Sequence, residues 1–293
     1  MLFNQRTITG PVRFSGVGLH SGKDVNLTIK PAPANHGIRF VRTDVLEHPG
    51  ISAHFSRVID TSLATVIGND GVIVSTIEHL MACLAGLCID NAIVELDAYE
   101  VPVMDGSAEP FTKEIVKAGI EKLQHPRQYF VLKKPISLKE NGKTVTAVPS
   151  SSFKITCKID FDHPLIKKQT YSIDMSGGCF ENEICGARTF GFFHEYELMK
   201  RFGLARGGSL DNAIVVDKEN ILNTEGLRYP DEFVRHKLLD CLGDFSLLGM
   251  PLLADVTVEK SGHAFNHAFL KKFLSRKDAW ETRFYETPLA IAG

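Results

Sequence analysis

Two short segments place histidine beside carboxylate residues at spacings that suit a divalent metal ion. His236 and Asp240 lie four residues apart in a stretch whose apolar residues repeat with helical spacing, so both project from one face of a predicted helix. An imidazole and a carboxylate placed in this way can bind one metal ion. Two ligands are too few for a tight site, so another segment must supply at least one more.

The second segment contains Glu78 and His79, in a predicted helix over residues 75–86 that is rich in good helix formers. Two interpretations of Glu78 are open. It has capping-box spacing from Ser75, and on that interpretation it only starts the helix. Alternatively, Glu78 faces a metal ion, and the positive end of the helix dipole keeps His79 in the neutral form that binds metals. One carboxylate cannot do both, and we expect Glu78 to face the metal.

A single catalytic centre can be assembled from these two segments. Catalytic zinc typically has three protein ligands and an open position for water. His79, His236 and Asp240 would fill this quota. Glu78 would then be free to act as the base for a water molecule whose pKa falls to about 7 on zinc.

A third histidine, His263, is predicted in the glycine-containing loop that follows the short strand over residues 256–258. It could protonate a leaving group, and Asp244, one helical turn beyond Asp240, could hold it in the charged form. The alternative is a structural histidine whose hydrogen bonds are satisfied. The spacing required for a His-Glu-x-x-His metalloprotease motif is absent from the sequence.

Composition excludes several classes of protein. A net charge of −2 and a pI of about 6.6 give no support for nucleic-acid binding. The start of the chain lacks the pattern of a secretory signal, and no apolar run approaches the roughly 18 residues that span a bilayer. None of the six cysteines forms a C-x-x-C pair, which favours reduced thiols and a cytoplasmic protein and disfavours a four-cysteine zinc site.

The order of predicted elements indicates two domains. Each half of the chain begins with short strands and reaches its helices late, and the mixed stretch over residues 119–130 resembles a boundary. We therefore predict one domain over residues 1–125, which carries Glu78 and His79, and a second over 126–293, which carries His236, Asp240 and His263. The other predicted helices cover residues 111–118, 192–202, 231–245 and a terminal segment that continues through Trp280.

Seven motifs, spread in order over nearly the whole chain, carry a resemblance to a known family. The sequence is similar to the zinc-dependent UDP-3-O-acyl-N-acetylglucosamine deacetylases of lipid A biosynthesis. The matching segments are residues 16–22, 75–80, 104–107, 188–191, 207–209, 233–240 and 260–263.

The resemblance implies a role for each of the residues identified above. Zinc would be held by His79, His236 and Asp240, and Fe²⁺ suits the same ligand set. Catalytic roles would fall to Glu78 as general base, His263 as general acid, Asp244 beside His263, and Thr189 at the oxyanion. The residues expected to bind substrate are Lys237, Lys260, Phe161, Phe190, His20, Leu19, Gly208, Ser209, Leu210, Ala213 and Val215.

The resemblance also implies an α+β fold of two similar domains, each a layered arrangement of β-sheets and helices. The layers would form a β-α-α-β sandwich with the active site between the domains and a small insert in each. The second insert is expected near residues 191–212. Its apolar residues would line a channel for an acyl chain, and they are Phe192, Phe193, Leu204, Leu210, Ala213 and Val215.

Our hypothesis is an amidohydrolase that removes the N-acetyl group from UDP-3-O-(3-hydroxyacyl)-N-acetylglucosamine, the committed step towards the lipopolysaccharide of the Gram-negative outer membrane. Water activated by zinc would attack the amide, with Glu78 taking its proton and His263 protonating the amine. The expected partner is this small molecule, without nucleic acid or a transmembrane segment, and the expected state is a monomer. Ala64 stands where some family members carry a cysteine, so a second, inhibitory metal ion is not expected. Two rivals are a zinc amidohydrolase for another acylated sugar or peptide, and a non-catalytic protein that binds sugar nucleotides or lipids.

Overall fold

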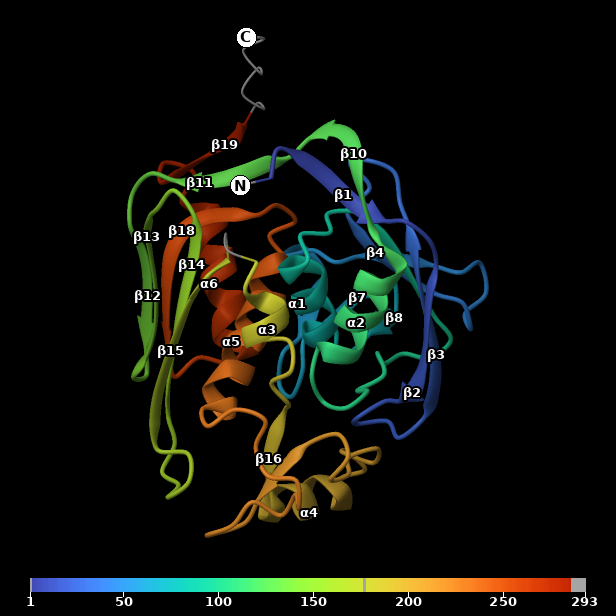
Figure 1. The fold of residues 1–293 in the computed structure, drawn as a ribbon, viewed down its shortest axis with the longest axis vertical. Helices are drawn as coiled ribbons and strands as arrows, with labels where there is room; N and C mark the ends of the chain where they lie inside the picture. Colours follow the sequence, from blue (N-terminus) through green and yellow to red (C-terminus); the bar gives the residue numbers. More distant parts are fainter. Residues whose placement is uncertain (1, 176–177, 286–293) are drawn as a thin grey trace.

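Two helices lie side by side at the centre of the molecule, between β-sheets that form its outer layers (Figure 1). They are α1 (Glu78–Gly86) and α5 (Glu232–Ser246). The computed structural model describes residues 2–175 and 178–285. Within them the order of layers is sheet, helices, helices, sheet.

The N-terminal half supplies one outer sheet with the strand order β2-β3-β9-β4-β5, in which β4 and β9 are parallel and the other pairs antiparallel. Its strands are β2 (Val12–Val17), β3 (Asp24–Pro31), β4 (Ile38–Arg42), β5 (Gly50–Ser52) and β9 (Ala92–Leu96). Alternate residues of β3 are buried, as expected for a strand with one face on a core. Smaller sheets and two helical segments complete this half: η1 (Phe55–Arg57), β6 (Val58–Asp60), β7 (Val66–Asn69), β8 (Val72–Val74), α2 (Glu109–Ala118), and β1 (Asn4–Ile8) paired with β10 (Ile120–Pro126).

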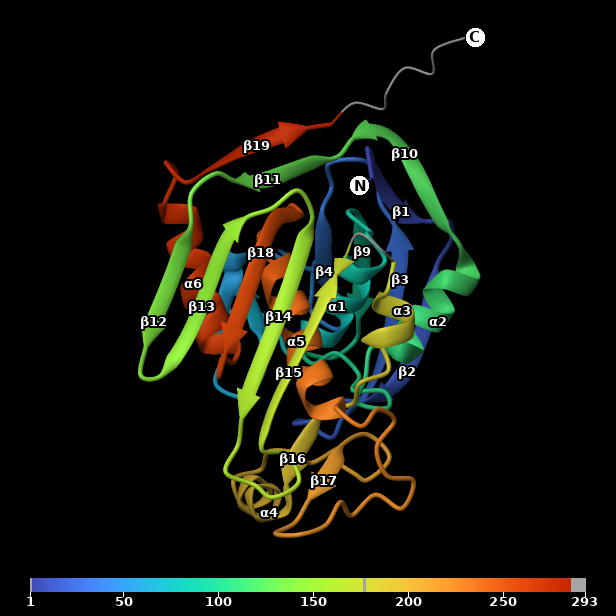
Figure 2. The ribbon, with the colours of Figure 1, turned by 60° about the vertical axis from the view of Figure 1, so that its left-hand side comes forward.

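The C-terminal half supplies the opposite sheet, seen face on in Figure 2. Its centre is β18 (Leu252–Glu259), which pairs antiparallel with β13 and parallel with β14 and β11. The remaining strands are β11 (Gln128–Leu132), β12 (Ile136–Glu140), β13 (Lys143–Pro149), β14 (Phe153–Asp160), β15 (Lys168–Asp174) and β19 (Trp280–Phe284). Helix α6 (His263–Ser275) follows β18 and packs against α5.

A small unit projects from one end of the C-terminal half (Figures 1 and 2). It contains β16 (Phe190–Phe192), α4 (Phe193–Arg201) and β17 (Ile214–Val216), with β16 and β17 paired in parallel. The short helix α3 (Phe180–Glu183) precedes it. This unit covers the segment in which the sequence predicts the second insert.

Helices α1 and α5 approach closely because α5 has a glycine at the point of contact. A Cβ atom on Gly243 would lie only 2.1 Å from the backbone oxygen of Glu78. Residues Glu78 to Leu84 of α1 are all buried, although Glu78 and His79 are polar. The contact therefore brings the start of α1, with its two polar side chains, against the C-terminal half of α5.

The mixed α+β class is confirmed, and the helices predicted over residues 111–118, 192–202 and 231–245 agree with α2, α4 and α5 to within two residues. One helix is wrong at both ends. His263 is the first residue of α6 and does not lie in a loop, and the helix ends at Ser275, because Trp280 belongs to strand β19. Trp280 packs on Phe130 and Phe273, and this tertiary contact overrides the helical pattern.

The six cysteines are all free, as predicted. No helix in the described ranges is long and apolar enough to cross a membrane. The division at residues 125 and 126 stays a prediction, and it falls at the end of β10.

The close contact at Gly243 gives a testable prediction. Gly243→Ala should lower the free energy of unfolding by about 1–3 kcal/mol, because the added methyl group overlaps the backbone of α1 and neither helix can yield locally. Thermal or urea denaturation measures the change. Gly10→Ala is the control, since a Cβ there meets nothing within 4 Å, and equal stability of the two variants would contradict the packing argument.

Candidate metal centre

Three side chains from the two central helices converge on one point. The Nε2 atoms of His79 and His236 lie 3.5 and 3.4 Å from Oδ1 of Asp240. One ligand atom from each residue lies within 4.8 Å of the others, and all three residues are buried. The structure thus brings together the three residues that the sequence predicts as ligands, one from α1 and two from α5.

The contacts around His236 and Asp240 leave their inward atoms free. Nδ1 of His236 lies 3.1 Å from the Ala187 carbonyl oxygen. Because a carbonyl oxygen can only accept a hydrogen bond, Nδ1 carries the proton and Nε2 has a free lone pair. Lys237 donates to Oδ2 of Asp240 at 2.9 Å. Oδ1 of Asp240, by contrast, is buried without a hydrogen-bond partner. A buried carboxylate oxygen in this condition is costly unless a cation completes it, so this donor set fits a divalent ion.

Burial and nearby charge put two of these groups into their metal-binding protonation states. Burial lowers the pKa of His236 to about 3, so its imidazole is neutral. Burial opposes the charge of Asp240, but its neighbouring groups outweigh burial and hold the pKa of this carboxyl well below its usual range. Because the His236 ring is itself neutral near pH 7, the attraction that acts there is that of the Lys237 ammonium. A neutral imidazole and an ionised carboxylate are the forms that bind a metal.

Glu78 lies beside this centre and does not cap its own helix. Its Oε2 accepts a hydrogen bond from the Thr65 amide at 3.0 Å, and Oε1 lies 3.7 Å from Nε2 of His263. Helix α1 begins without a side-chain cap, so the capping-box interpretation with Ser75 is wrong. Burial raises the pKa of Glu78 above its ordinary value. A carboxylate with a raised pKa is better suited to accept a proton near neutral pH.

His263 is held between two carboxylates. Its Nδ1 lies 2.9 Å from Oδ2 of Asp244, and its Nε2 faces Glu78. Burial disfavours the charged ring, but Asp244 and then Glu78 outweigh burial and raise the pKa of His263 to about 10. Asp244 is in turn fixed by the Thr65 hydroxyl at 2.6 Å and by Nδ2 of Asn266 at 2.8 Å. A purely structural histidine would account for the contact of Nδ1 with Asp244. It does not account for Nε2, which faces the carboxylate of Glu78.

Thr189 lies at the start of the segment that enters the small projecting unit. Its amide donates to the Gly106 carbonyl and its carbonyl accepts from the Ile214 amide, both at 2.8 Å. A Cβ on Gly106 would lie 2.1 Å from the backbone oxygen of Asn212, so this loop and the insert are in close contact. The backbone of Thr189 is therefore well fixed, while its role at an oxyanion stays a prediction.

A second group of predicted residues surrounds a cavity of about 250 Å³ near the centre. Lys237, Lys260 and Phe161 line it together with Asp160 and Ser261. Nζ of Lys260 lies 2.6 Å from Asp160, a partner that the sequence did not single out. Phe190 connects this cavity to the metal centre, since its ring lies 5.7 Å from that of Phe161 and 6.2 Å from that of His236.

Residues 16–22 of the N-terminal half, a segment with three glycines, meet the projecting unit. The amide of Gly207 donates to the Leu19 carbonyl and the amide of Arg206 to the His20 carbonyl, at 3.0 and 3.3 Å. Among the apolar residues predicted to line an acyl channel, Phe193 and Leu210 are 42% and 46% exposed. The same unit contains the other residues predicted for the channel, which are Phe192, Leu204, Ala213 and Val215. It also contains Gly208 and Ser209, which are predicted to bind substrate. Their substrate role stays a prediction.

Four residues contact the site or the segments around it, although the sequence does not predict them: Thr65, Ala187, Asn266 and Glu100. Thr65, Ala187 and Asn266 act through contacts between segments far apart in the chain or through backbone atoms, which leave no local pattern. Glu100 is 1% exposed and accepts the amides of His20 and Ser21 and the Thr76 hydroxyl. Thr76 has φ +60°, a strained value for a β-branched residue just before α1.

Comparison with known proteins identifies the family of the chain. A family model described as UDP-3-O-acyl N-acetylglycosamine deacetylase matches residues 5–275. The UDP-3-O-acyl-N-acetylglucosamine deacetylase of Myxococcus xanthus is 51% identical, over 95% of this chain and 89% of its own. The proteins of the same name from Syntrophus aciditrophicus and Teredinibacter turnerae are 46% and 49% identical, each over 96% of this chain and over 89% and 93% of their own.

The pKa of His263 gives a pH prediction for the metal-free protein. The pKa of His263 is about 6.5 in an unfolded chain and about 10 in the folded state. Between pH 6.5 and about pH 10 the folded state therefore holds one proton more than the unfolded chain. The contribution of His263 to stability is complete below pH 6.5 or so and is lost as pH rises through about 10.

NMR titration of the His263 ring measures this pKa directly. Asp244→Asn should lower it by at least about one unit, because the larger of the two attractive charges is removed. Asp278→Asn is the control, since Asp278 pairs with Arg276 on the surface. A pKa near 6.5 in the parent protein would contradict the argument.

Proposed function

Because the chain belongs to the UDP-3-O-acyl N-acetylglycosamine deacetylase family, we propose that it removes the N-acetyl group from UDP-3-O-(3-hydroxyacyl)-N-acetylglucosamine, the committed step of lipid A synthesis. The observation that carries the mechanism is the unpartnered Oδ1 of Asp240, on which His79 and His236 converge. A metal-dependent amidohydrolase needs this kind of donor set, together with a base and an acid next to it.

His79, His236 and Asp240 would hold the metal ion, which we propose to be zinc. Bound there, the ion supplies Lewis-acid polarisation of the amide carbonyl and makes water more acidic. Two imidazoles and one carboxylate suit Fe²⁺ as well, so the identity of the ion in the cell depends on supply as well as on affinity.

Glu78 and His263 would take the two roles that amide hydrolysis requires, proton acceptor and proton donor. Glu78 accepts a proton from water as the water oxygen bonds to the acetyl carbon. His263, charged at neutral pH through its two carboxylate neighbours, donates the proton on Nε2 to the amine nitrogen as the C–N bond breaks. Asp244 keeps the proton of Nδ1 on the ring, and Thr189 would donate a hydrogen bond to the oxyanion. The products are acetate and a free amine.

Charge and shape support a nucleotide sugar as the substrate. Lys237 and Lys260 place two cations at the cavity lined by Phe161, where a diphosphate and a base ring would find complementary groups. The projecting unit would contact the acyl chain through its exposed apolar side chains Phe193 and Leu210. The six free cysteines fit a reducing compartment, so we place the reaction in the cytoplasm. That the enzyme is a monomer stays a prediction from the family resemblance.

An amidohydrolase that acts on another acylated sugar would use the same metal centre. The rates of acetate release from different substrates distinguish that assignment from the one proposed here. We expect rapid release from UDP-3-O-(3-hydroxyacyl)-N-acetylglucosamine and slow release from UDP-N-acetylglucosamine, which lacks the acyl chain, and from the acylated sugar without UDP. Equal rates on all three would contradict the substrate assignment.

The donor set predicts the metal content of the protein. The purified chain should hold one ion per molecule, and prolonged treatment with a chelator should abolish acetate release until Zn²⁺ is restored. Metal analysis beside the assay measures both. His79→Ala should lower the metal content sharply, whereas His125→Ala, at a partly buried histidine of β10 outside the group of three, should leave it unchanged.

The proton donor and acceptor give a second prediction about activity. Glu78→Gln and His263→Ala should each reduce turnover by about 10²–10⁴-fold, because each removes general acid–base catalysis, while the melting temperature shows that both variants fold. Glu114→Gln is the control, at an exposed glutamate on α2. Near-normal turnover in both site variants would refute the mechanism.

A further inference from the structure

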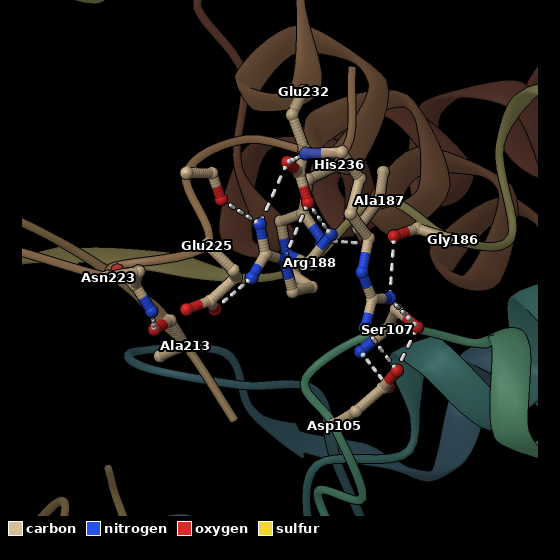
Figure 3. A network of polar contacts seen from close by, with 12 residues as sticks. Asp105, Ser107, Gly186, Ala187, Arg188, Ala213, Asn223, Glu225, Glu232 and His236 are labelled. Atoms are coloured by element: carbon tan, nitrogen blue, oxygen red, sulfur yellow. Dashed lines mark hydrogen bonds and ion pairs between the residues drawn. The ribbon is translucent and has the colours of Figure 1, made fainter. Parts of the chain in front are cut away.

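One peptide unit lies between two side chains of helix α5. The Ala187 carbonyl accepts the hydrogen bond of His236 at 3.1 Å, and the Arg188 amide, at the other end of the same peptide, donates to Oε1 of Glu232 at 3.0 Å. Glu232 and His236 are one helical turn apart, so they project from the same face of α5. Because the C=O and N–H of a trans peptide point in opposite directions, this peptide is held at both ends (Figure 3).

A buried ion pair fixes the Glu232 end. Nε and Nη2 of Arg188 donate to Oε1 and Oε2 of Glu232 at 2.9 and 3.2 Å, a bidentate arrangement. Arg188 is 3% exposed and Glu232 is 0% exposed. Oε2 of Glu232 also accepts the amide of Arg228 at 2.5 Å. The carboxylate is therefore saturated with donors and cannot rotate without losing several of them.

The ion pair is also anchored on its outer side. Nη1 of Arg188 donates to Glu225 at 2.7 Å, and Nη2 donates to the Gly226 carbonyl at 2.6 Å. Arg228 continues the network to the N-terminal half, where it donates to Asp105 at 2.8 Å. Figure 3 shows Arg188 between Glu232 and Glu225 in this network.

We propose that Arg188 and Glu232 are positioning residues for the metal centre: by fixing the 187–188 peptide, they hold His236 with its proton on Nδ1 and the lone pair of Nε2 towards the metal. This inference rests on the proposed metal-dependent function. A histidine ligand is oriented by the hydrogen bond that its other nitrogen makes, and that bond is only as fixed as its acceptor. Without the ion pair the peptide can tilt, and the tautomer with the proton on Nε2, which cannot bind a metal there, gains population.

The test compares two pairs of substitutions that remove a buried ion pair. Arg188→Met with Glu232→Leu removes both charges together, so no unpaired charge stays buried. The matched control is Arg127→Met with Asp90→Leu. That pair is also largely buried, with Nε and Oδ1 2.7 Å apart, and Asp90 likewise accepts a backbone amide, that of Arg6 at 2.9 Å. Neither residue of the control belongs to the metal group.

The measurement is the affinity of the metal-free, folded protein for Zn²⁺, by competition with a chromophoric chelator. We expect the Arg188–Glu232 double variant to bind about 10–100-fold more weakly than the parent, and the control to bind as the parent does. Glu232→Gln keeps an acceptor oxygen for the Arg188 amide, so the Zn²⁺ affinity of this variant should lie between that of the double variant and that of the parent. It is the variant to measure if the double variant does not fold. Parental affinity in a folded site variant would overturn the proposal.

A second measurement separates this proposal from the proposed function. ¹⁵N NMR of the metal-free protein reports the tautomer of His236, which should be Nδ1–H in the parent and mixed in the site variant. A parent protein that binds no Zn²⁺ would refute the metal-dependent function. The same tautomer in parent and site variant would refute the positioning role alone, whatever the metal does.

Discussion

The structure depends on the contact between α1 and α5, where the backbone of Gly243 meets the carbonyl of Glu78. Any larger residue would separate the helices, and the two halves of the metal centre would move apart with them. The helices lie in the middle of a sheet–helix–helix–sheet arrangement, so their contact is covered from both sides. The positions of the polar side chains on α1 and α5 therefore depend on core packing, because both helices are largely buried.

Burial then sets the chemistry. Burial lowers the pKa of His236, which keeps its imidazole neutral, and it raises the pKa of Glu78, because burial disfavours the charged form of both groups. His263 would be neutral for the same reason, but the carboxylates on either side of its ring outweigh burial. The acid and the base of the proposed reaction therefore owe their different pKa shifts mainly to their different neighbours.

Much of the site was accessible from the sequence because its residues carry local patterns. The i, i+4 spacing of His236 and Asp240 and the next turn to Asp244 need only a helix to be meaningful, and that helix was predicted within a residue at each end. The end of the chain was predicted poorly, because Trp280 and its aromatic neighbours decide between helix and strand through contacts that no window of sequence contains.

The sequence by itself determined the identities of the chemical groups, their family resemblance and the helices that carry most of them. Only the tertiary structure decided what each group faces. Glu78 could have capped α1 or turned inward, and the Thr65 amide, 13 residues earlier in the chain, holds it inward. The peptide between Ala187 and Arg188 contacts His236 and Glu232 through its backbone C=O and N–H groups. Every residue except proline has both groups, so no residue type in the sequence could indicate these contacts. Orientation depends on packing between distant segments, and spacing along the chain cannot encode it.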